Sequence, residues 1–255
     1  MFKQTAKSSL KLFLVFTAVA CILLTIIMTV FTPSTMENIA ASSGNLPINP
    51  LGNISTLIDF LANQYFGMMA LILPIIYVIV VGNRMIAGQV DRGSMVYSLS
   101  APVTRNQITL TSVLFMVSSL IVMFALIAGV GIGVASLVQP GVLDNQAFLR
   151  LALGDFALQF AIAGIVFCAS CIFNRSSRSL IFGAGLPILF FIADLLAGMS
   201  KDLEFFKYFS LISLFDKDAL IKGTGYLGGV ILLVGLGLVF VLAGMKVFKE
   251  KDLPL

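Results

Sequence analysis

Residues 12–31 read LFLVFTAVACILLTIIMTVF, twenty residues without a single charge. A helix of about 20 apolar residues crosses the roughly 30 Å of hydrocarbon in a bilayer. The run is too long for the apolar core of a signal peptide, and no A-x-A cleavage pattern follows it. Residues 12–31 are therefore predicted to form a retained membrane-spanning helix.

The rest of the chain has a composition that fits the same solvent. Apolar residues make up 59% of the 255 residues and charged residues only 11%, whereas soluble domains average about 25% charged residues. Further apolar runs long enough to span lie at residues 61–82, 108–138, 151–173, 180–199 and 226–245. The expected fold is a single all-α transmembrane domain over residues 1–255 with six membrane helices.

The distribution of Lys and Arg predicts the orientation. Eleven of these residues fall on the side that holds both chain ends, and five fall on the other side. Cytoplasmic loops carry the excess of positive charge. Both termini and the connection between spans two and three are therefore expected in the cytoplasm. The net charge of +4 is not clustered on one face as nucleic-acid binding requires, so no nucleic-acid partner is expected.

Two connections are expected on the outside. Residues 33–60 are rich in Asn, Ser, Pro and Gly and are expected to be irregular or partly helical. Residues 201–225 mix charges with aromatic and aliphatic residues. Such a mixture suits short amphipathic helices in the membrane interface, where aromatic rings are enriched.

The inner connection, residues 82–107, carries the most informative pattern. Its apolar residues recur near a helical period, which predicts an amphipathic helix on the cytoplasmic surface. Gly93 is expected to interrupt this helix and Pro102 to end it. Thr104 and Gln107 have the spacing of a capping box for the next helix. The composition alone is equally consistent with a plain surface connector and with a docking element for a cytoplasmic partner.

Two acids fall inside predicted spans, Asp155 in the fourth and Asp194 in the fifth, and Gln159 lies one helical turn from Asp155. Ionisable groups in a membrane are costly and are functional candidates by default. They could couple transport to protons or contact a cationic substrate. The alternative is that both lie near the outer leaflet or a water-filled cavity and are simply solvated or paired.

Several kinds of chemistry are excluded or disfavoured. The chain has no G-x-x-x-x-G-K-[ST] phosphate loop and no histidine. Cys168 and Cys171 form a C-x-x-C pair, but no His accompanies them and both lie in an apolar run, so they are interpreted as buried core residues. No metal site and no catalytic residue are therefore predicted.

Three stretches resemble the membrane subunits of type-2 ABC exporters. Residues 89–105 (QVDRGSMVYSLSAPVTR) share with that family an acid, a Gly-Ser pair, an apolar stretch, and then Pro followed by Arg. Residues 248–255 (FKEKDLPL) are similar to the family's usual ending. Residues 208–216 (YFSLISLFD) resemble its outer segment before the sixth span.

The resemblance implies an assembly of two six-span subunits, identical or homologous, each bound to one of two cytoplasmic ATPase subunits. The N-terminal residues 2–11 would lie along the inner membrane surface, and residues 201–225 would cap the pathway outside. ATP and Mg would bind the ATPase, with no cofactor on this chain. The expected location is the bacterial plasma membrane. The residues that would form the coupling helix against the ATPase are Gln89, Asp91, Arg92, Gly93 and Ser94.

The cargo expected from such spans is amphipathic or apolar: a membrane-active or antimicrobial peptide, a lipid or a hydrophobic drug. Asp155, Gln159 and Asp194 are the candidate residues on its pathway. Two other functions stay open at this point. One is an ion-coupled secondary transporter that uses Asp155 or Asp194, although no inverted repeat is visible. The other is a membrane enzyme or non-transporting scaffold, although no nucleophile–base pair is discernible.

Overall fold

The computed structural model describes residues 2–30, 56–95, 104–199 and 201–251. For residues 2–8 and 201–202 it describes the backbone alone. All regular structure in these residues is helical. This follows from the solvent, because lipid offers no hydrogen bonds and a helix satisfies its own backbone. Six helical segments are long and apolar enough to cross a bilayer, which confirms the predicted all-α fold with six spans.

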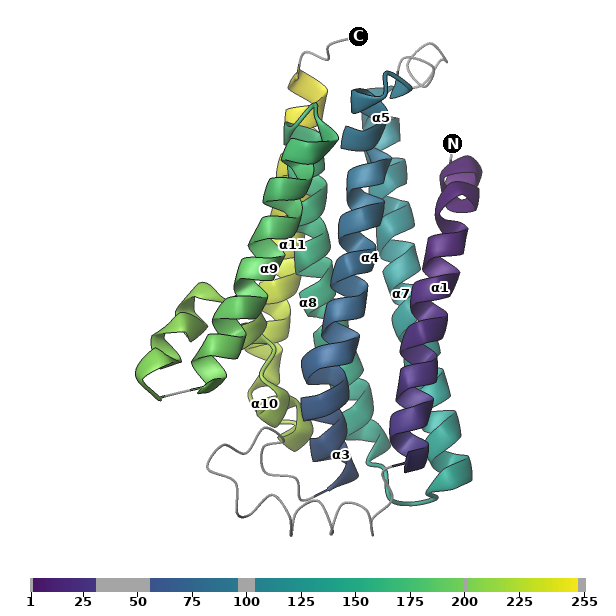
Figure 1. Cartoon of the computed structure of the whole chain (residues 1–255), viewed down its shortest axis with the longest axis vertical. Helices are drawn as coiled ribbons and strands as arrows, with labels where there is room; N and C mark the ends of the chain where they lie inside the picture. Colours follow the sequence, from purple (N-terminus) through teal and green to yellow (C-terminus); the bar gives the residue numbers. More distant parts are fainter. Residues whose placement is uncertain (1, 31–55, 96–103, 200, 252–255) are drawn as a thin grey trace.

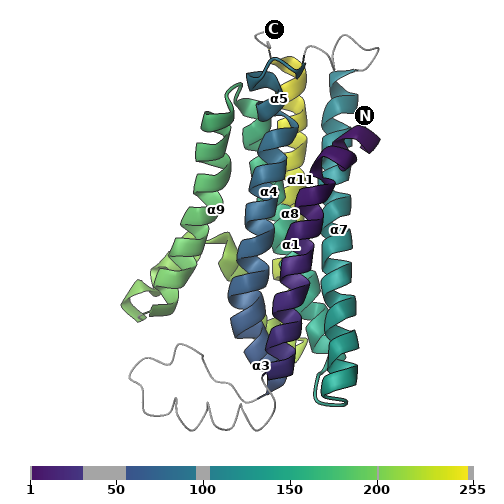
Figure 2. The same ribbon diagram turned by 45° about the vertical axis from the view of Figure 1, so that its right-hand side comes forward.

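The first two spans differ in their regularity. Helix α1 (Phe2–Val30) is one continuous helix that contains the predicted first span, and its N-terminal part bends away from the bundle (Figure 2). The second span, Leu57–Met85, consists of three segments: α3 (Leu57–Phe60), a π-helix η1 (Leu61–Met69) and α4 (Ala70–Met85). Helix α4 continues through Pro74, as membrane helices tolerate.

The other four spans are single helices: α7 (Arg105–Val138), α8 (Asn145–Ile172), α9 (Ser176–Met199) and α11 (Tyr226–Glu250). All four extend past a predicted limit, α8 by six residues at its start. The cap of α8 explains its early start, since Asp144 accepts bonds from the Gln146 and Ala147 amides. The predicted Thr104–Gln107 capping box at the start of α7 is confirmed.

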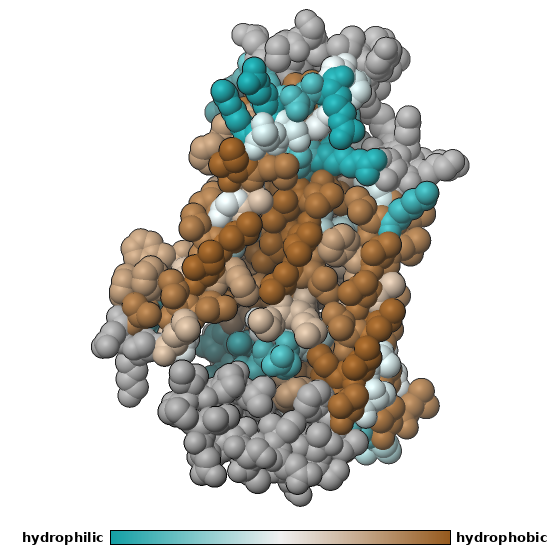
Figure 3. Space-filling view, viewed as in Figure 1, coloured by the Kyte–Doolittle hydropathy of each residue, from teal (hydrophilic) through white to brown (hydrophobic). Residues whose placement is uncertain are grey.

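The bundle has two distinct ends. At one end α1 begins and α11 stops, and α5 (Ala87–Asp91) lies beside them (Figure 1). We call this the terminal end. Helices α3 and α10 (Lys217–Lys222) lie at the other, which we call the α10 end. Apolar residues cover the middle of the face drawn in Figure 3, and hydrophilic residues gather at the terminal end. An even number of crossings thus places both chain ends on one side.

Helix α8 is the centre of the bundle. In its most apolar stretch 89% of the residues are buried, against 22% in α11 and 17% in α9. Its backbone comes very close to that of α11, where a Cβ built on Gly164 would lie 2.6 Å from the Gly237 carbonyl oxygen. Small residues allow membrane helices this close approach. The packing therefore depends on a glycine at a point where two backbones meet.

Helix α9 leans outward from the bundle toward the α10 end (Figures 1 and 2). It continues into two 3₁₀ segments, η2 (Lys201–Phe209) and η3 (Leu211–Leu214), before α10. These short helices occupy the connection that was predicted to hold interfacial helices. Three regions with predictions lie outside the described residues: most of the outer loop (31–55), the second half of the inner connection (96–103) and the chain end (252–255).

Candidate functional site: the elbow at the terminal end

The second span ends in a sharp change of direction at Ile86, whose backbone (φ −124°, ψ −70°) is not helical. Helix α5 follows and is fixed to two other helices. The Ala87 amide donates to Ser170 Oγ of α8 at 2.9 Å, and Asn83 Nδ2 donates to Ser176 Oγ of α9 at 2.6 Å. The start of the inner connection is therefore held against the end of α8 and the beginning of α9.

Helix α5 has one buried side and one exposed edge. Ile86, Val90 and Met95 are buried, while Asp91, Arg92 and Gly93 are exposed. Residues 86–95 thus have a buried side and an exposed edge. We call residues 86–95 the elbow. It presents the charged residues Asp91 and Arg92 on an apolar base.

The backbone turns at Gly93, where φ is +68°. Only glycine adopts this region at little cost. The Gly93 amide donates to the Val90 carbonyl at 3.0 Å, and Ser94 Oγ donates to the Gln89 carbonyl at 3.2 Å. The predicted interruption at Gly93 is thus a left-handed helix end that closes the elbow with its own hydrogen bonds.

A polar groove of about 490 Å³ runs beside the elbow. Its lining combines Val90 and Asp91 with residues of the α8–α9 turn: Ile172, Phe173, Asn174, Arg175 and Arg178. The Asn174 side-chain oxygen is buried and has no hydrogen-bond partner in the part of the chain that the structure describes. Sequence reasoning counted Arg175 and Arg178 as cytoplasmic charges but did not place them next to Asp91.

The far end of the inner connection is fastened by a second set of bonds, which we call the clamp. Arg105, the first residue of α7, donates from Nη1 to the carbonyls of Lys251 at 2.6 Å and Lys249 at 3.4 Å. Lys251 Nζ in turn donates to the last carbonyls of α8, at Ile172 (2.6 Å) and Cys171 (3.1 Å). A cation at a helix C-terminus is favourable, since the carbonyls there have no partners within the helix.

Burial lowers the pKa of the Lys251 ammonium, and the nearby Cys171 thiol opposes this shift. The cost of that burial is offset by the two carbonyls that the ammonium meets. Both ends of the inner connection are thus fastened to α8, one directly at Ser170 and the other through Arg105 and Lys251. No local sequence pattern indicates the clamp, because its members are separated by 79 to 146 residues.

The candidate pathway residues lie elsewhere, in two separate places. Asp155 and Gln159 are fully buried in α8, where Gln159 Nε2 donates to Asp155 Oδ1 at 3.3 Å and to the Leu71 carbonyl of span two at 3.0 Å. The other carboxyl oxygen of Asp155 has no hydrogen-bond partner among the described residues. Gln159 thus bonds to Asp155 one turn away and also joins α8 to the turn that precedes Pro74.

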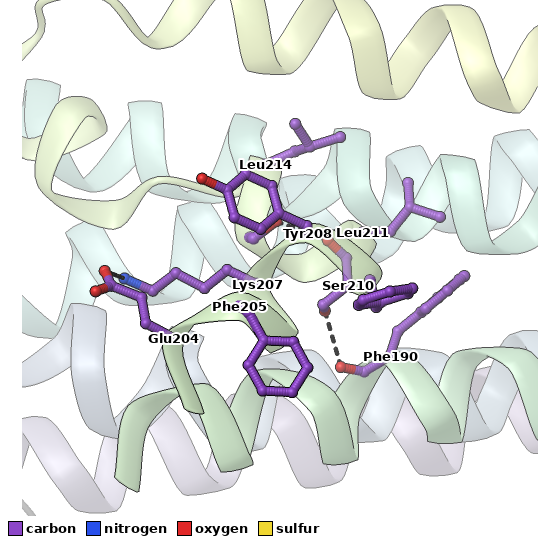
Figure 4. Close-up of a pocket in the computed structure, with 10 residues that line it drawn as sticks. Phe190, Glu204, Phe205, Lys207, Tyr208, Ser210, Leu211 and Leu214 are labelled. Carbon is purple, nitrogen blue, oxygen red and sulfur yellow. Dashed lines mark hydrogen bonds and ion pairs between the residues drawn. The ribbon is translucent and has the colours of Figure 1, made fainter. Parts of the chain in front are cut away.

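Asp194 is not part of that pair. It is half-buried in the last turns of α9, and no hydrogen bond or ion pair joins it to Asp155 among the described residues. A separate hollow of about 770 Å³ lies nearby between α9, η2 and η3 (Figure 4). Phe190, Phe205 and Leu211 line it, Ser210 Oγ donates to the Phe190 carbonyl at 2.8 Å, and a Lys207–Glu204 ion pair at 3.0 Å lies at its edge.

Comparison with known protein families decides what kind of protein carries this elbow. The sequence profile described as ABC-2 family transporter protein matches residues 5–253. The chain belongs to this family. No individually curated protein matches it. As an ABC-2 protein it is a multi-pass permease subunit of an ABC transporter in the plasma membrane, a transport component rather than a catalytic subunit.

The bond that fixes the elbow of this ABC-2 permease has a measurable contribution to stability. We expect Ser170→Ala to destabilise the purified chain by about 1–3 kcal/mol, because the buried Ala87 amide loses its acceptor. Thermal unfolding in detergent measures the loss. Ser118→Ala is the matched control, since Ser118 Oγ bonds only within its own helix, to the Phe115 carbonyl at 3.0 Å. Equal stability of the two variants would mean that Ser170 does not hold the elbow.

Proposed function

We propose that the chain is the permease of an exporter in which two such subunits, identical or homologous, each bind one of two cytoplasmic ATPase subunits through the elbow. The observation that carries this proposal is the exposed edge Asp91–Arg92–Gly93 on a base fixed to α8 and α9. It lies at the terminal end, where Lys and Arg predominate. We infer that this end faces the cytoplasm, in a bacterial plasma membrane.

In this proposal the energy comes from the partner. The chain has no phosphate loop, so ATP and Mg bind the ATPase subunit and no cofactor binds here. The ATPase contacts Gln89, Asp91, Arg92, Gly93 and Ser94 in the elbow. The groove beside Asp91, with Arg175 and Arg178, extends the same contact surface and favours an acidic patch on the ATPase.

In this proposal, movement of the elbow is transmitted through α8 to the candidate pathway residues. Both ends of the inner connection are hydrogen-bonded to the end of α8, at Ser170 and through Lys251. The same helix carries Asp155 and Gln159 near its middle. ATP binding then favours one arrangement of the bundle by differential binding to two states. Helix α8 is the element that connects docking to the pathway.

The cargo proposed here is amphipathic or hydrophobic: a membrane-active or antimicrobial peptide, a lipid or a drug. Support comes from the spans, whose exposed residues are largely Leu, Ile, Val and Phe. Asp155, Gln159 and Asp194 are the polar residues that we place along the pathway. An ion-coupled transporter is the competing function, and the unpartnered carboxyl oxygen of Asp155 is the observation in its favour.

A test of docking uses the backbone of the elbow. We expect Gly93→Val to weaken binding of the ATPase subunit by about tenfold, because a left-handed backbone costs a side chain about 1–2 kcal/mol and 1.4 kcal/mol corresponds to a factor of ten. Asp91→Arg, which reverses the charge beside the groove, is expected to weaken it as well. Affinity is measured with the purified ATPase subunit and the full chain in nanodiscs.

Gly141→Val provides the matched control. Gly141 also has a positive φ of +81° and open space around its Cβ position, but it lies in the turn between α7 and α8 at the α10 end. Valine at position 141 therefore strains the backbone as valine at position 93 does, but at the opposite end of the bundle from the elbow. ATPase affinity that falls equally in both variants, or in neither, would contradict docking at the elbow.

A further inference from the structure

After α9 the chain folds back along the span that it has just formed. Helix α9 ends at Met199 and η2 begins at Lys201. Just after η2, Ser210 Oγ donates to the Phe190 carbonyl of α9 at 2.8 Å. Phe190 precedes the end of α9 by nine residues, which corresponds to roughly 13 Å along the helix at about 1.5 Å per residue. The η2 segment therefore lies beside the last turns of a membrane-spanning helix.

This fold-back forms the hollow of about 770 Å³ that Figure 4 shows. Small-molecule sites measure roughly 300–1,000 Å³ and are lined mainly by apolar side chains with a few polar groups. The hydroxyls of Ser210 and Ser213 already donate to backbone carbonyls, and an ordered water needs about two to four polar partners. An apolar chain therefore fits the hollow better than water does. Most of the lining side chains are aromatic or aliphatic: Phe190, Phe205, Tyr208, Phe209, Leu211 and Leu214.

The hollow adjoins the apolar surface that α9 presents to the membrane. Only 17% of the most apolar stretch of α9 is buried in the bundle. Ile188, Leu189 and Ile192, the neighbours of Phe190 along the helix, are 47–60% exposed. Because α9 is long and apolar enough to cross the bilayer, acyl chains are the apolar groups that surround this surface. A chain that enters the hollow stays in contact with the lipid around α9.

The two ends of the hollow differ in polarity. The Lys207–Glu204 ion pair lies at one end, and Phe190 and Leu211 lie toward the other (Figure 4). The two charged side chains are 53% and 62% exposed. Such an exposed pair contributes little to stability, so its groups change partners at low cost. A headgroup that carries both a phosphate and an ammonium offers a partner to each of them, whereas an anionic headgroup matches only the lysine.

We propose that this hollow binds one acyl chain of a zwitterionic phospholipid. The phosphate of the headgroup contacts Lys207 and its ammonium contacts Glu204. The acyl chain lies against Phe190 and the aromatic rings of η2. The lipid is bound as a part of the membrane, not as cargo, so the site goes beyond the proposed function. Its occupation needs no ATPase subunit and is tested without one.

The test uses tryptophan fluorescence, because the chain contains no Trp. Phe190→Trp places a single reporter in the hollow, and Leu189→Trp is the matched control on the neighbouring, exposed position that does not line it. The full chain is placed in nanodiscs of phosphatidylglycerol that contain increasing amounts of phosphatidylcholine with brominated acyl chains, which quench Trp. Half-quenching at position 190 is expected at a phosphatidylcholine fraction about threefold or more below that at position 189, because two weak charge contacts add.

Charge variants in the Phe190→Trp background test the headgroup contacts. Glu204→Gln leaves the lysine without its counter-ion, so the preference at position 190 is expected to move toward phosphatidylglycerol. Lys207→Gln leaves the carboxylate alone and is expected to keep the preference for phosphatidylcholine. Lys222→Gln is the control, because Lys222 is exposed and does not line the hollow. Tyr208→Trp is the second reporter if Phe190→Trp does not fold, since Tyr208 lines the hollow and is 92% exposed.

Three results would overturn the proposal. Equal quenching curves at positions 190 and 189 would mean ordinary contact with the surrounding lipid. A lipid preference that Glu204→Gln leaves unchanged, or that Lys222→Gln alters as much, would remove the headgroup contacts. Quenching at position 189 but not at position 190 would assign the hollow to another protein surface, such as a second copy of the chain. Failure of the proposed function would leave all these measurements as they are, because they contain no ATPase subunit.

Discussion

Gly164→Ala is expected to lower the free energy of unfolding by at least about 1–3 kcal/mol, the usual cost of overpacking a core. The new methyl would lie 2.6 Å from the Gly237 carbonyl oxygen and 3.1 Å from the Gly237 Cα. Both are backbone atoms, which cannot rotate away as a side chain can. Helices α8 and α11 would have to separate, and the centre of the bundle with them. Thermal unfolding of the purified chain measures the effect.

Gly235→Ala is the matched control for this prediction. Gly235 lies on α11 only two residues from Gly237, yet a Cβ there would meet nothing within 4 Å. Since alanine favours a helix over glycine by about 1 kcal/mol, this variant should be neutral or slightly more stable. Gly164→Ala with wild-type stability would show that α8 and α11 do not meet at these glycines.

The double variant Arg105→Gln, Lys251→Met is expected to lower coupled transport at least about tenfold, because each lost bond to a charged group is worth about 1.5–3 kcal/mol. It removes the clamp, through which Arg105 at the end of the inner connection is linked by Lys251 to the C-terminus of α8. The elbow itself is not changed. ATPase binding should therefore persist while the number of cargo molecules moved per ATP falls.

Two measurements in proteoliposomes check this separation, transport per ATP hydrolysed and ATPase affinity. Arg105→Lys is expected to recover part of the coupling, since an ammonium can still donate to a carbonyl. Lys246→Gln is the control, as Lys246 is an exposed cation near the end of α11, the helix that Lys251 directly follows. Loss of ATPase binding in the double variant would assign the clamp to docking rather than to coupling.

The spans could be predicted from the sequence because lipid imposes a simple rule on length and composition. Hydropathy marks the part of a helix in hydrocarbon, whereas caps and hydrogen bonds decide where the helix ends. The fourth span shows the difference, since its predicted start at Leu151 lies six residues after the structural start of α8 at Asn145. Arg150 lies between the two, charged and still helical.

The candidate site divides in the same way. Features that depend on near neighbours were predictable: the interruption at Gly93 and the Thr104–Gln107 box. Features that depend on distant neighbours were not. The Ala87–Ser170 bond joins residues 83 apart, and the Arg105–Lys251 bond joins residues 146 apart. No periodicity in one sequence indicates which distant residues meet.

The location of the elbow is the central claim, and labelling of Arg92→Cys tests it most directly. Arg92 is exposed, and the background would have Cys21, Cys168 and Cys171 replaced by alanine. A membrane-impermeant maleimide is applied to inside-out vesicles and to intact cells, with and without the bound ATPase subunit. Val142→Cys, in the turn at the α10 end, reports the opposite side.

We predict that position 92 reacts only in inside-out vesicles and that the bound ATPase subunit blocks the reaction, while position 142 reacts only in intact cells. Reaction of position 92 from outside intact cells would contradict the orientation. Reaction in inside-out vesicles that the ATPase subunit leaves unchanged would contradict docking at the elbow.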